Sequence, residues 1–347
     1  MTDMLLVSLG TTRGLRIQDA QFARIAREAG ASVAVTGVRI GLTNRLRRGY
    51  PVNDIVEGIA ARRALDAALR AHAPRSIVFS TTTAALLASA HGLPFAVWMD
   101  SPARLNRPGL RNAGLHALER RRLAAARLVL VLSAPAADAL PRGSAPAVVI
   151  SPPVAPAPPR PERSDPLAVA YVPDPKAKGL ELLARAWAQV SDGDAQLVIS
   201  GIDPEHARAF LARRGVPVPG RVELAGMLAP DAFGALLLRA RAFVSAAAWE
   251  DFGQAPLQAL DHGAALVCAP GGGPFPALAI ARGLEPAFVA SDRTPAALAT
   301  AISAALARDE VRLAAYRASA RERLGPFRHA EQLRRMRDLV LPALLDG

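Results

Sequence analysis

Short, continuous apolar runs alternate with longer stretches of helical periodicity along nearly the whole chain. Before residue 151, the apolar runs that predict strands are 5–9, 32–38, 76–80, 95–99, 128–132 and 148–150. After residue 166 they are 168–172, 196–200, 222–224, 242–245, 264–268 and 287–289. Strands that are apolar on both faces and alternate with helices form parallel sheets covered on both sides. The sequence therefore predicts an α/β protein with doubly wound sheets.

A proline-rich stretch divides this pattern into two halves. Residues 152–166 contain seven prolines in fifteen positions, which prevents regular structure and predicts a stiff linker. At 347 residues the chain is long enough for two domains of about 150 residues each. We therefore predict one domain over residues 1–151 and a second over residues 167–326. A last basic amphipathic helix is predicted over residues 328–340.

The composition narrows the class of protein. Hydrophobic residues make up 51% and charged residues 21%, which is typical of a globular chain. No apolar run reaches the ~18 residues that a membrane span needs, and the N-terminus lacks the basic region of a secretory signal. The single cysteine, Cys268, excludes a disulfide framework and is expected in a buried strand. A cytoplasmic protein is therefore expected.

The positive charge is concentrated in the first half of the chain. Residues 1–150 hold 20 Arg against 9 Asp and Glu, whereas residues 151–347 hold 22 Arg and Lys against 21 Asp and Glu. Such a basic half attracts an anionic partner, either a membrane with acidic headgroups, to which the protein would bind peripherally, or a phosphorylated acceptor. Nucleic acid is disfavoured because no recognition motif is present and aromatic residues make up only 5%. Arginine enrichment on a solvated face is the alternative.

The chain has two lysines, Lys176 and Lys178, against forty arginines, and both lie in one short segment. This segment follows a predicted strand and precedes a predicted helix. A compact ammonium group beside a helix N-terminus suits a phosphate, because exposed N–H groups and the helix dipole already favour negative charge there. We therefore expect a phosphate-binding lysine at this place, with a solvated surface lysine as the alternative.

The most specific segment is Val244–Pro276, which predicts a strand, an acidic loop, a tight turn, a helix from residue 254, and then a strand and a glycine-rich loop. Glu250 follows the strand, where its carboxylate can accept hydrogen bonds from ligand hydroxyls. The backbone N–H groups of Phe252–Ala255 open the helix and could cradle a diphosphate. An acidic helix cap accounts for Glu250 or Asp251 alone, but not for the whole pattern.

This segment resembles the signature of retaining, nucleotide-sugar-dependent glycosyltransferases of the GT-B fold, and it is most similar to glycosyltransferase family 4. That family carries a Glu, then Phe-Gly, then a second Glu eight residues after the first. The matching positions here are Glu250, Phe252, Gly253 and Gln258. Further matches follow in family order at Lys178-Gly179, Ser200-Gly201 and Gly226. The resemblance covers residues 167–323 and is only architectural for residues 1–150.

The resemblance implies a GT-B architecture, in which two Rossmann-like doubly wound domains face each other across a cleft. The C-terminal domain binds a nucleotide-diphosphate sugar as co-substrate, and the N-terminal domain binds the acceptor. Residues 327–347 are expected to pack back on the N-terminal domain. Such enzymes retain the anomeric configuration of the sugar and require neither a metal nor another cofactor.

The same resemblance assigns roles to individual residues. As catalytic residues, Lys178 neutralises the diphosphate leaving group and Glu250 holds the sugar hydroxyls. Gln258 contacts the ribose, and the loops of Ile202 and Met227 flank the base. The donor-binding residues expected in this way are Lys176, Gly201, Met227, Phe252, Gly253, Gln254 and Gln258.

Two departures from the family pattern lie in the donor site. The second Glu is Gln258, which still accepts a hydrogen bond but less strongly than a carboxylate. The arginine that usually precedes the lysine is replaced by Pro173 or, in a shifted register, by Asp174, and Lys176 is a candidate for the missing charge. A non-catalytic sugar-nucleotide-binding protein is therefore one alternative. A nucleotide-sugar epimerase is another, although the histidines are badly placed for it.

The N-terminal half offers fewer candidates. Gly10, Thr11, Thr12 and Arg13 follow the first predicted strand, where such enzymes keep a glycine loop near the donor phosphates, and an ordinary strand-to-helix turn is the alternative. Asp100 follows the fourth strand and is a candidate acceptor-side carboxylate or a turn former. Four arginines after the second strand could grip an anion: Arg39, Arg45, Arg47 and Arg48. The six histidines show no metal-ligand spacing, so no metal site is predicted.

Overall fold

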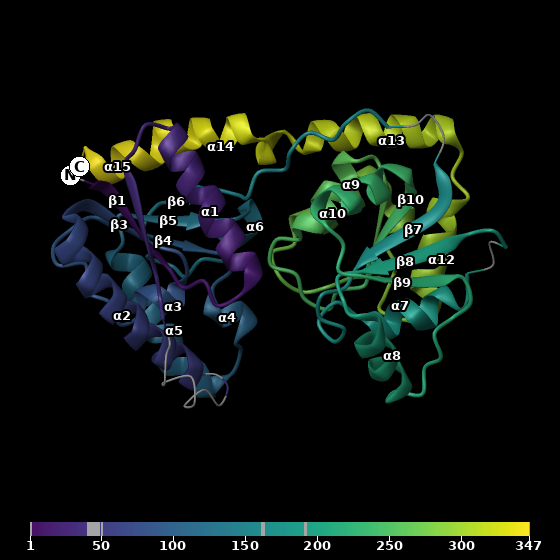
Figure 1. The fold of residues 1–347 in the computed structure, drawn as a ribbon, viewed down its shortest axis with the longest axis horizontal. Helices are drawn as coiled ribbons and strands as arrows, with labels where there is room; N and C mark the ends of the chain where they lie inside the picture. The colour runs from purple at the N-terminus through teal and green to yellow at the C-terminus, as the bar shows by residue number, and fades with distance from the viewer. Residues whose placement is uncertain (1, 40–48, 50, 161–163, 191–192, 347) are drawn as a thin grey trace. The chain divides into compact units, whose positions relative to one another are not determined.

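The computed structural model describes residues 2–39, 49, 51–160, 164–190 and 193–346. The chain divides into two compact units (Figure 1). Unit 1 consists of Met1–Pro153 together with His329–Gly347, and unit 2 consists of Val154–Arg328. Of the four arginines expected to grip an anion, Arg45, Arg47 and Arg48 lie outside the described residues.

Unit 1 contains a six-stranded parallel sheet in the order β2-β1-β3-β4-β5-β6. The strands are β1 (Thr2–Ser8), β2 (Val33–Gly37), β3 (Pro74–Phe79), β4 (Phe95–Met99), β5 (Leu128–Val131) and β6 (Ala147–Val149). The helices between them are α1 (Arg13–Glu28), α2 (Val52–His72), α3 (Thr82–Ala85), α4 (Ala103–Asn106), α5 (Ala113–Ala125) and α6 (Ala134–Asp138). The first five strands have the order of flavodoxin-like proteins, in which the direction of winding reverses between β1 and β3.

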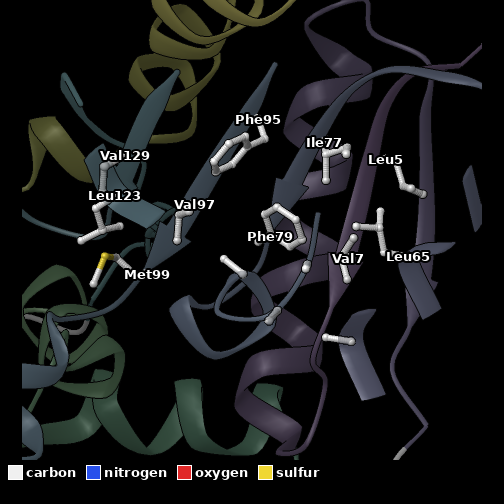
Figure 2. Packing of buried hydrophobic residues seen from close by; sticks show 14 of the residues in the cluster. Leu5, Val7, Leu65, Ile77, Phe79, Phe95, Val97, Met99, Leu123 and Val129 are labelled. Carbon is white, nitrogen blue, oxygen red and sulfur yellow. The ribbon is translucent and has the colours of Figure 1, made fainter. Parts of the chain in front are cut away.

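The core of unit 1 explains why its strands are apolar at successive positions. Met4, Leu5, Leu6 and Val7 of β1 are all fully buried, because helices cover both faces of the sheet. Figure 2 shows one side of this core, where Leu5 and Val7 lie with Ile77 and Phe79 of β3 and with Leu65 of α2 (the residues labelled there are Leu5, Val7, Leu65, Ile77, Phe79, Phe95, Val97, Met99, Leu123 and Val129). The strong apolar signal in the sequence therefore corresponds to two-sided burial.

Unit 2 contains a five-stranded parallel sheet in the order β11-β10-β7-β8-β9. The strands are β7 (Asp165–Tyr171), β8 (Gln196–Ser200), β9 (Val222–Gly226), β10 (Ala240–Ser245) and β11 (Ala265–Cys268). The helices are α7 (Leu180–Trp187), α8 (Pro204–Ala212), α9 (Pro230–Arg239), α10 (Gln254–Asp261), α11 (Pro276–Leu284), α12 (Pro295–Leu306) and α13 (Glu310–Arg323). This is the Rossmann order, with the reversal between β7 and β10.

Two predicted elements are wrong. Residues 287–289 were expected to form a strand, but Pro286–Phe288 is a 3₁₀ helix, and only an isolated bridge joins Val289 to Cys268. Proline has no N–H to donate to a ladder and suits the first turn of a helix. The helical periodicity of residues 83–90 in the sequence likewise predicts a helix, but α3 ends at Ala85, because the amides of Leu86 and Ala88 bond three residues back and the chain continues in turns.

The proline-rich stretch forms hydrogen bonds with other parts of unit 2. Arg160 donates to the backbone oxygens of His262, at 2.8 Å, and of Ala240, and also to Ser164. Its burial, together with nearby Arg317, lowers the pKa of this guanidinium to about 10. The amide of Ala157 donates to Asp261. Residues 152–160 have no regular structure, whereas Asp165 and Pro166, which were expected in the linker, are the first residues of β7. Side-chain contacts that the proline count does not reveal hold Ala157 and Arg160 in place.

The C-terminal segment belongs to unit 1. It consists of α14 (His329–Arg335), a π-helical turn (Met336–Val340) and α15 (Leu341–Leu345). Figure 1 shows α14, in yellow, alongside α1, and Arg337 donates to the backbone oxygen of Glu28 at 3.0 Å. Gln332 is fully buried and accepts a hydrogen bond from the amide of Ser151 at 2.8 Å. These contacts make residues 329–346 part of the unit 1 core.

Replacing Met336 by alanine tests this contribution. Met336 is completely buried, so we expect Met336→Ala to lower the free energy of unfolding of unit 1 by about 2–4 kcal/mol. The matched control is Leu339→Ala, because Leu339 is 46% exposed and lies in the same turn; its cost should stay below about 1 kcal/mol. Native-state hydrogen exchange at the amides of β1 and β3 reports on unit 1 separately. Equal effects of the two substitutions would contradict the packing described here.

Candidate functional site

The candidate site lies where the strand order of the second sheet reverses. The loops that follow β7 and β10 leave neighbouring strands toward opposite faces of the sheet, and such a switch point leaves a crevice at the carboxyl ends of the strands. Residues 172–179 follow β7, and residues 246–253 follow β10. These two loops carry Lys178 and Glu250, the two residues predicted to be catalytic.

The turn that carries Lys178 is built by Asp174 and Gly179. The Asp174 carboxylate accepts hydrogen bonds from the amides of Lys176, at 2.9 Å, and Ala177, at 2.8 Å. Gly179 has a φ of +70°, and a Cβ built on it would lie 2.1 Å from the carbonyl oxygen of Ala246. Only glycine fits so close to the end of β10 in this backbone conformation. Asp174, one of the two positions at which the family's arginine is expected, is therefore the residue that shapes the lysine turn.

The loop that carries Glu250 is held by the glycine-rich segment after β11. The amide of Glu250 donates to the carbonyl of Gly272 at 3.1 Å, and the amide of Gly272 donates to the carbonyl of Ala248 at 2.9 Å. A Cβ on Gly273, whose φ is +92°, would lie 2.3 Å from the carbonyl oxygen of Glu250. The glycine run thus allows two backbones to approach closely and fixes the position of Glu250.

Arg293 is a bracing residue that the sequence did not reveal. Its guanidinium donates to three backbone oxygens: Ala247 at 2.7 Å, Pro270 at 2.7 Å and Ala246 at 2.9 Å. Its pKa is lowered by burial. The residue lies between Asp292 and Thr294, which form an ordinary helix start, so no local pattern separates it from a surface arginine.

Lys178 and Glu250 meet in an ion pair. The Lys178 Nζ donates to Glu250 Oε2 at 2.6 Å, and the two side chains are only 23% and 16% exposed. A charge-assisted hydrogen bond of this length is among the stronger polar interactions in proteins. The pair lines a pocket of about 180 Å³, together with Tyr171, Pro173 and Gln254 among others.

The pocket also contains the N-terminus of α10. Gly253, with a φ of +76°, precedes the helix, and a Cβ on it would lie 2.4 Å from the ring of Phe275. No side chain caps the helix, and Gln254 and Ala255 line the pocket. The first amides of a helix lack partners within the helix and favour negative charge. The pocket therefore combines an ammonium group, a carboxylate and a helix N-terminus.

The other residues expected to bind the donor do not line this pocket. Lys176 lines a separate hollow beside Arg185 and Arg214. Phe252 is 6% exposed and packs on Phe327, with ring centroids 5.8 Å apart, so it supports the loop from within the core.

Three further donor candidates lie around the strand ends. A Cβ built on Gly201 would lie 2.7 Å from the ring of Tyr171. Glycine at this position therefore leaves room for that ring, which lines the pocket. Met227 follows β9 and is 58% exposed. Gln258 is half-buried one helical turn beyond Gln254. The structure thus brings together Lys178, Glu250, Gly253 and Gln254, and leaves the other candidates outside the pocket.

Comparison with known families identifies the domain that carries this pocket. Residues 165–308 match the family described as glycosyl transferases group 1, a span that runs from β7 to the end of α12 and includes both loops. The protein is a glycosyltransferase. None of the curated proteins matches the chain.

Solved structures show that the glycosyltransferase has the GT-B fold. Sucrose-phosphate synthase from Thermosynechococcus elongatus superposes with a TM-score of 0.75 at 16% identity, over 100% of both chains. A glycosyltransferase from Rickettsia africae gives 0.70 at 14% identity, over 100% of this chain and 99% of that chain. Anabaena HepE in complex with UDP and glucose gives 0.70 at 15% identity, over 98% of this chain and 99% of that chain. At such low identity, these likenesses establish the fold and not the substrate.

In unit 1 of the glycosyltransferase, the Gly10 loop follows β1 at the other switch point. Gly10 has a φ of +55°, and its carbonyl accepts a hydrogen bond from Arg16 at 2.8 Å. Thr12 caps α1 by accepting from the amide of Leu15 at 3.2 Å, and Arg13 is the first residue of the helix. Thr11 lies half-buried between them. These contacts form a strand-to-helix turn, and no contact of the described residues gives the loop a further role.

Asp19 of α1 is a buried carboxylate that the sequence did not single out. It is 3% exposed and accepts a hydrogen bond from the hydroxyl of Ser8, while its Oδ1 has no hydrogen-bond partner among the described residues. Burial raises the pKa of Asp19 to about 6, although hydrogen bonds from Ser8 and Ser80 oppose the shift. Nothing in the sequence around Asp19 indicates burial, because an acidic residue in a helix usually faces solvent.

Asp100 acts locally as a turn former. Its Oδ1 accepts a hydrogen bond from the amide of Ser101 at 2.8 Å, directly after β4. Among the described residues, no three His, Cys, Asp or Glu side chains are grouped so that they could hold a metal ion. No helix in the described part of the glycosyltransferase is both long and apolar enough to cross a membrane.

The contact at Gly179 can be tested by comparing two glycines of unit 2. Gly179→Ala adds a Cβ that meets the Ala246 carbonyl and also disfavours the positive φ, so we expect it to destabilise unit 2 by more than about 2 kcal/mol and to weaken nucleotide binding. Gly215 has a similar φ of +66° with nothing within 4 Å of a built Cβ, so Gly215→Ala should cost only about 1 kcal/mol. Urea unfolding of both variants provides the measurement. A loss at Gly179 no larger than at Gly215 would show that the close approach is unimportant.

The burial of Asp19 predicts a dependence of stability on pH. Because its pKa is raised from 3.8 to about 6 in the folded state, its contribution to stability is fully present below pH 4 and is lost as the pH rises through 6. Asp19→Asn removes this titration. The stability of the variant relative to the wild type should therefore rise by up to about 3 kcal/mol between pH 4 and pH 7. Hydrogen exchange of unit 1 across this range measures the difference, and a constant difference would contradict the raised pKa.

Proposed function

We propose that this glycosyltransferase transfers a sugar from a nucleotide-diphosphate sugar to an anionic acceptor, with retention of configuration and without a metal. The observation that carries this proposal is the ion pair of Lys178 and Glu250 beside the N-terminus of α10, at the switch point of a group 1 domain. This arrangement offers positive charge to a diphosphate and a carboxylate to sugar hydroxyls.

The ion pair can be exchanged for contacts to a donor. Lys178 and Glu250 satisfy each other at 2.6 Å. An incoming diphosphate offers Lys178 a more highly charged partner, and the sugar hydroxyls can then donate to Glu250. Gln254 and Ala255, at the start of α10, line the same pocket, and a helix N-terminus favours the diphosphate. Because HepE is described in complexes with UDP and with UDP-glucose, UDP-glucose is the first donor to test.

The same residues account for the chemistry of transfer. Cleavage of the bond between the sugar and the diphosphate leaves negative charge on the departing oxygen, which Lys178 and the α10 amides are placed to stabilise. Glu250 is the one carboxylate that lines the pocket among the described residues, and its proposed role is to accept hydrogen bonds from the sugar hydroxyls rather than to attack the sugar. This supports retention through positioning of the acceptor on the face that the diphosphate leaves. Lys178 supplies there the positive charge that a metal ion contributes in other transferases.

The charge of the chain supports an anionic acceptor. The chain has a net charge of +12, and residues 1–150 contribute most of it, because they hold 20 Arg against 9 Asp and Glu. A basic domain attracts phosphorylated molecules and anionic membrane surfaces. We therefore propose a phosphorylated or lipid-linked acceptor, in a cytoplasmic protein that associates peripherally with anionic membranes.

The two lysines provide a matched test of the donor site. In thermal unfolding with UDP, UDP-glucose and other nucleotides, a bound ligand at 100 times its Kd stabilises the native state by about 2.7 kcal/mol. We expect Lys178→Ala to abolish this shift and Lys176→Ala to preserve it, since the two variants lose the same charge from the same turn but Lys176 lines a different hollow.

A third variant separates diphosphate binding from sugar binding. Glu250→Gln should retain the shift with UDP and reduce the additional shift with UDP-glucose, because it affects the sugar hydroxyls more than the diphosphate. Donor turnover with acceptor extracts and assignment of the anomeric configuration of the product then test retention. No shift with any nucleotide, or equal losses at Lys176 and Lys178, would contradict the proposed site.

A further inference from the structure

A second hollow, larger than the pocket of Lys178 and Glu250, lies in unit 1. It has a volume of about 730 Å³ and is formed by one face of α5, the start of α4 and the residues after α6. Ala113, His116, Ala117 and Arg120 recur at helical spacing along α5, so they share this face. The residues on the opposite side are Ala139, Leu140, Pro141 and Arg142. The volume is in the range of small-molecule sites.

Three arginines surround this hollow without a counter-charge. Arg104, Arg120 and Arg142 all line it, and none of them forms a hydrogen bond or an ion pair with another described residue. Many other arginines of the chain, such as Arg75 and Arg317, bond to carboxylates or backbone oxygens. Like charges gathered around one hollow raise its positive potential and favour an anionic occupant.

The carboxylate at this hollow does not neutralise the arginines. Glu119 is 1% exposed, and both of its oxygens lie 3.0 Å from the amide of Ala103, which donates to them. Burial raises the pKa of Glu119 to about 7, so it carries only part of a charge at neutral pH. By holding Ala103 at the start of α4, Glu119 also fixes the position of the neighbouring Arg104.

The segment of sequence around the hollow is also strongly basic. Residues 103–142 hold eight Arg against two acidic residues, so this segment supplies about half of the excess positive charge of residues 1–150. The same segment also carries exposed apolar side chains that do not line the hollow: Leu105 is 37% exposed, Leu118 is 38% exposed and Leu110 is 93% exposed. Leu140 and Pro141 add apolar wall inside it. An occupant with an anionic group and an apolar or carbon-rich part fits these features.

We propose that the hollow lined by Arg104, Arg120 and Arg142 is a binding site for the phosphate group of the acceptor. Guanidinium groups suit phosphate because they donate paired hydrogen bonds in a fixed plane. The proposal rests on the proposed transferase function and adds to it the acceptor class and the residues that recognise it. The phosphate can belong to a water-soluble molecule or to a lipid headgroup, and the exposed leucines are relevant only to the second.

Calorimetric titration with inorganic pyrophosphate, in the presence of saturating UDP, tests the site. UDP occupies the donor pocket of unit 2, so additional binding of pyrophosphate reports on unit 1. We expect the double variant Arg120→Gln/Arg142→Gln to weaken this binding by at least about tenfold, which corresponds to 1.4 kcal/mol. The control Arg111→Gln/Arg121→Gln removes the same charge from exposed residues that do not line the hollow, and it should change binding less than about threefold.

Two further arms complete the design. Arg104→Gln is a single change that should also weaken binding, and the UDP-induced thermal shift shows whether each variant is folded. Cosedimentation with phosphatidylcholine vesicles, with and without phosphatidic acid, distinguishes the source of the phosphate. Binding only to the acidic vesicles, reduced by Leu110→Ser, indicates a lipid, whereas pyrophosphate binding without vesicle binding indicates a soluble acceptor; both support the site.

The inference and the proposed function fail in different ways. No pyrophosphate binding by the wild type, or equal losses in the double variant and its control, overturns the phosphate site while UDP binding stands. If UDP itself does not bind, the proposed donor site is wrong, and the pyrophosphate titration is then made on Lys178→Ala protein. Binding that depends on Arg120 and Arg142 under those conditions would still support the hollow as an anion site.

Discussion

The position of Lys178 depends on the contact between Gly179 and the carbonyl of Ala246. A parallel sheet fixes where β7 and β10 end, but it does not fix how the loops beyond them meet. The close approach at Gly179 presses the lysine turn against the end of β10, and Arg293 holds the same stretch of backbone through three carbonyl oxygens. The ammonium group consequently reaches Glu250 at 2.6 Å without being carried on a regular element. Backbone packing around the two loops therefore fixes the position of the Lys178 ammonium group relative to Glu250.

The charged residues of the two units have different local surroundings. In unit 2 many are paired, as in the group formed by Arg241, Glu310 and Arg317, and these pairs hold loops and helix ends together. In unit 1 several arginines on α4, α5 and the segment after α6 have no such partners among the described residues. Paired charges mainly stabilise the fold, whereas unpaired ones remain available to a ligand. The uneven net charge of the sequence therefore corresponds to a difference in how the arginines of the two units are paired, which is the basis for the proposed anion site in unit 1.

The sequence predicted most of the strands because burial on both faces leaves a continuous apolar run. The resemblance to glycosyltransferase family 4 also predicted that Lys178 and Glu250 share a site, and the two side chains do meet in one pocket. The sequence did not predict that Arg293 braces that site, because its partners lie 23 to 47 residues away and no local pattern marks them. It placed Lys176 with Lys178, yet the turn made by Asp174 directs the two toward different hollows. Side-chain direction within a turn depends on such contacts and cannot be obtained from periodicity.

The chain passes from unit 1 to unit 2 after Pro153 and returns to unit 1 at His329. Unit 2 is continuous in sequence, whereas unit 1 is completed by residues that a ribosome adds only after unit 2. During synthesis, unit 2 can therefore close as soon as α13 emerges, while the surface of α1 that α14 covers remains open until α14 has emerged as well. Removal of residues 329–346 would expose apolar surface in the unit whose synthesis begins first. The order in which the two units mature is thus the reverse of the order in which they begin.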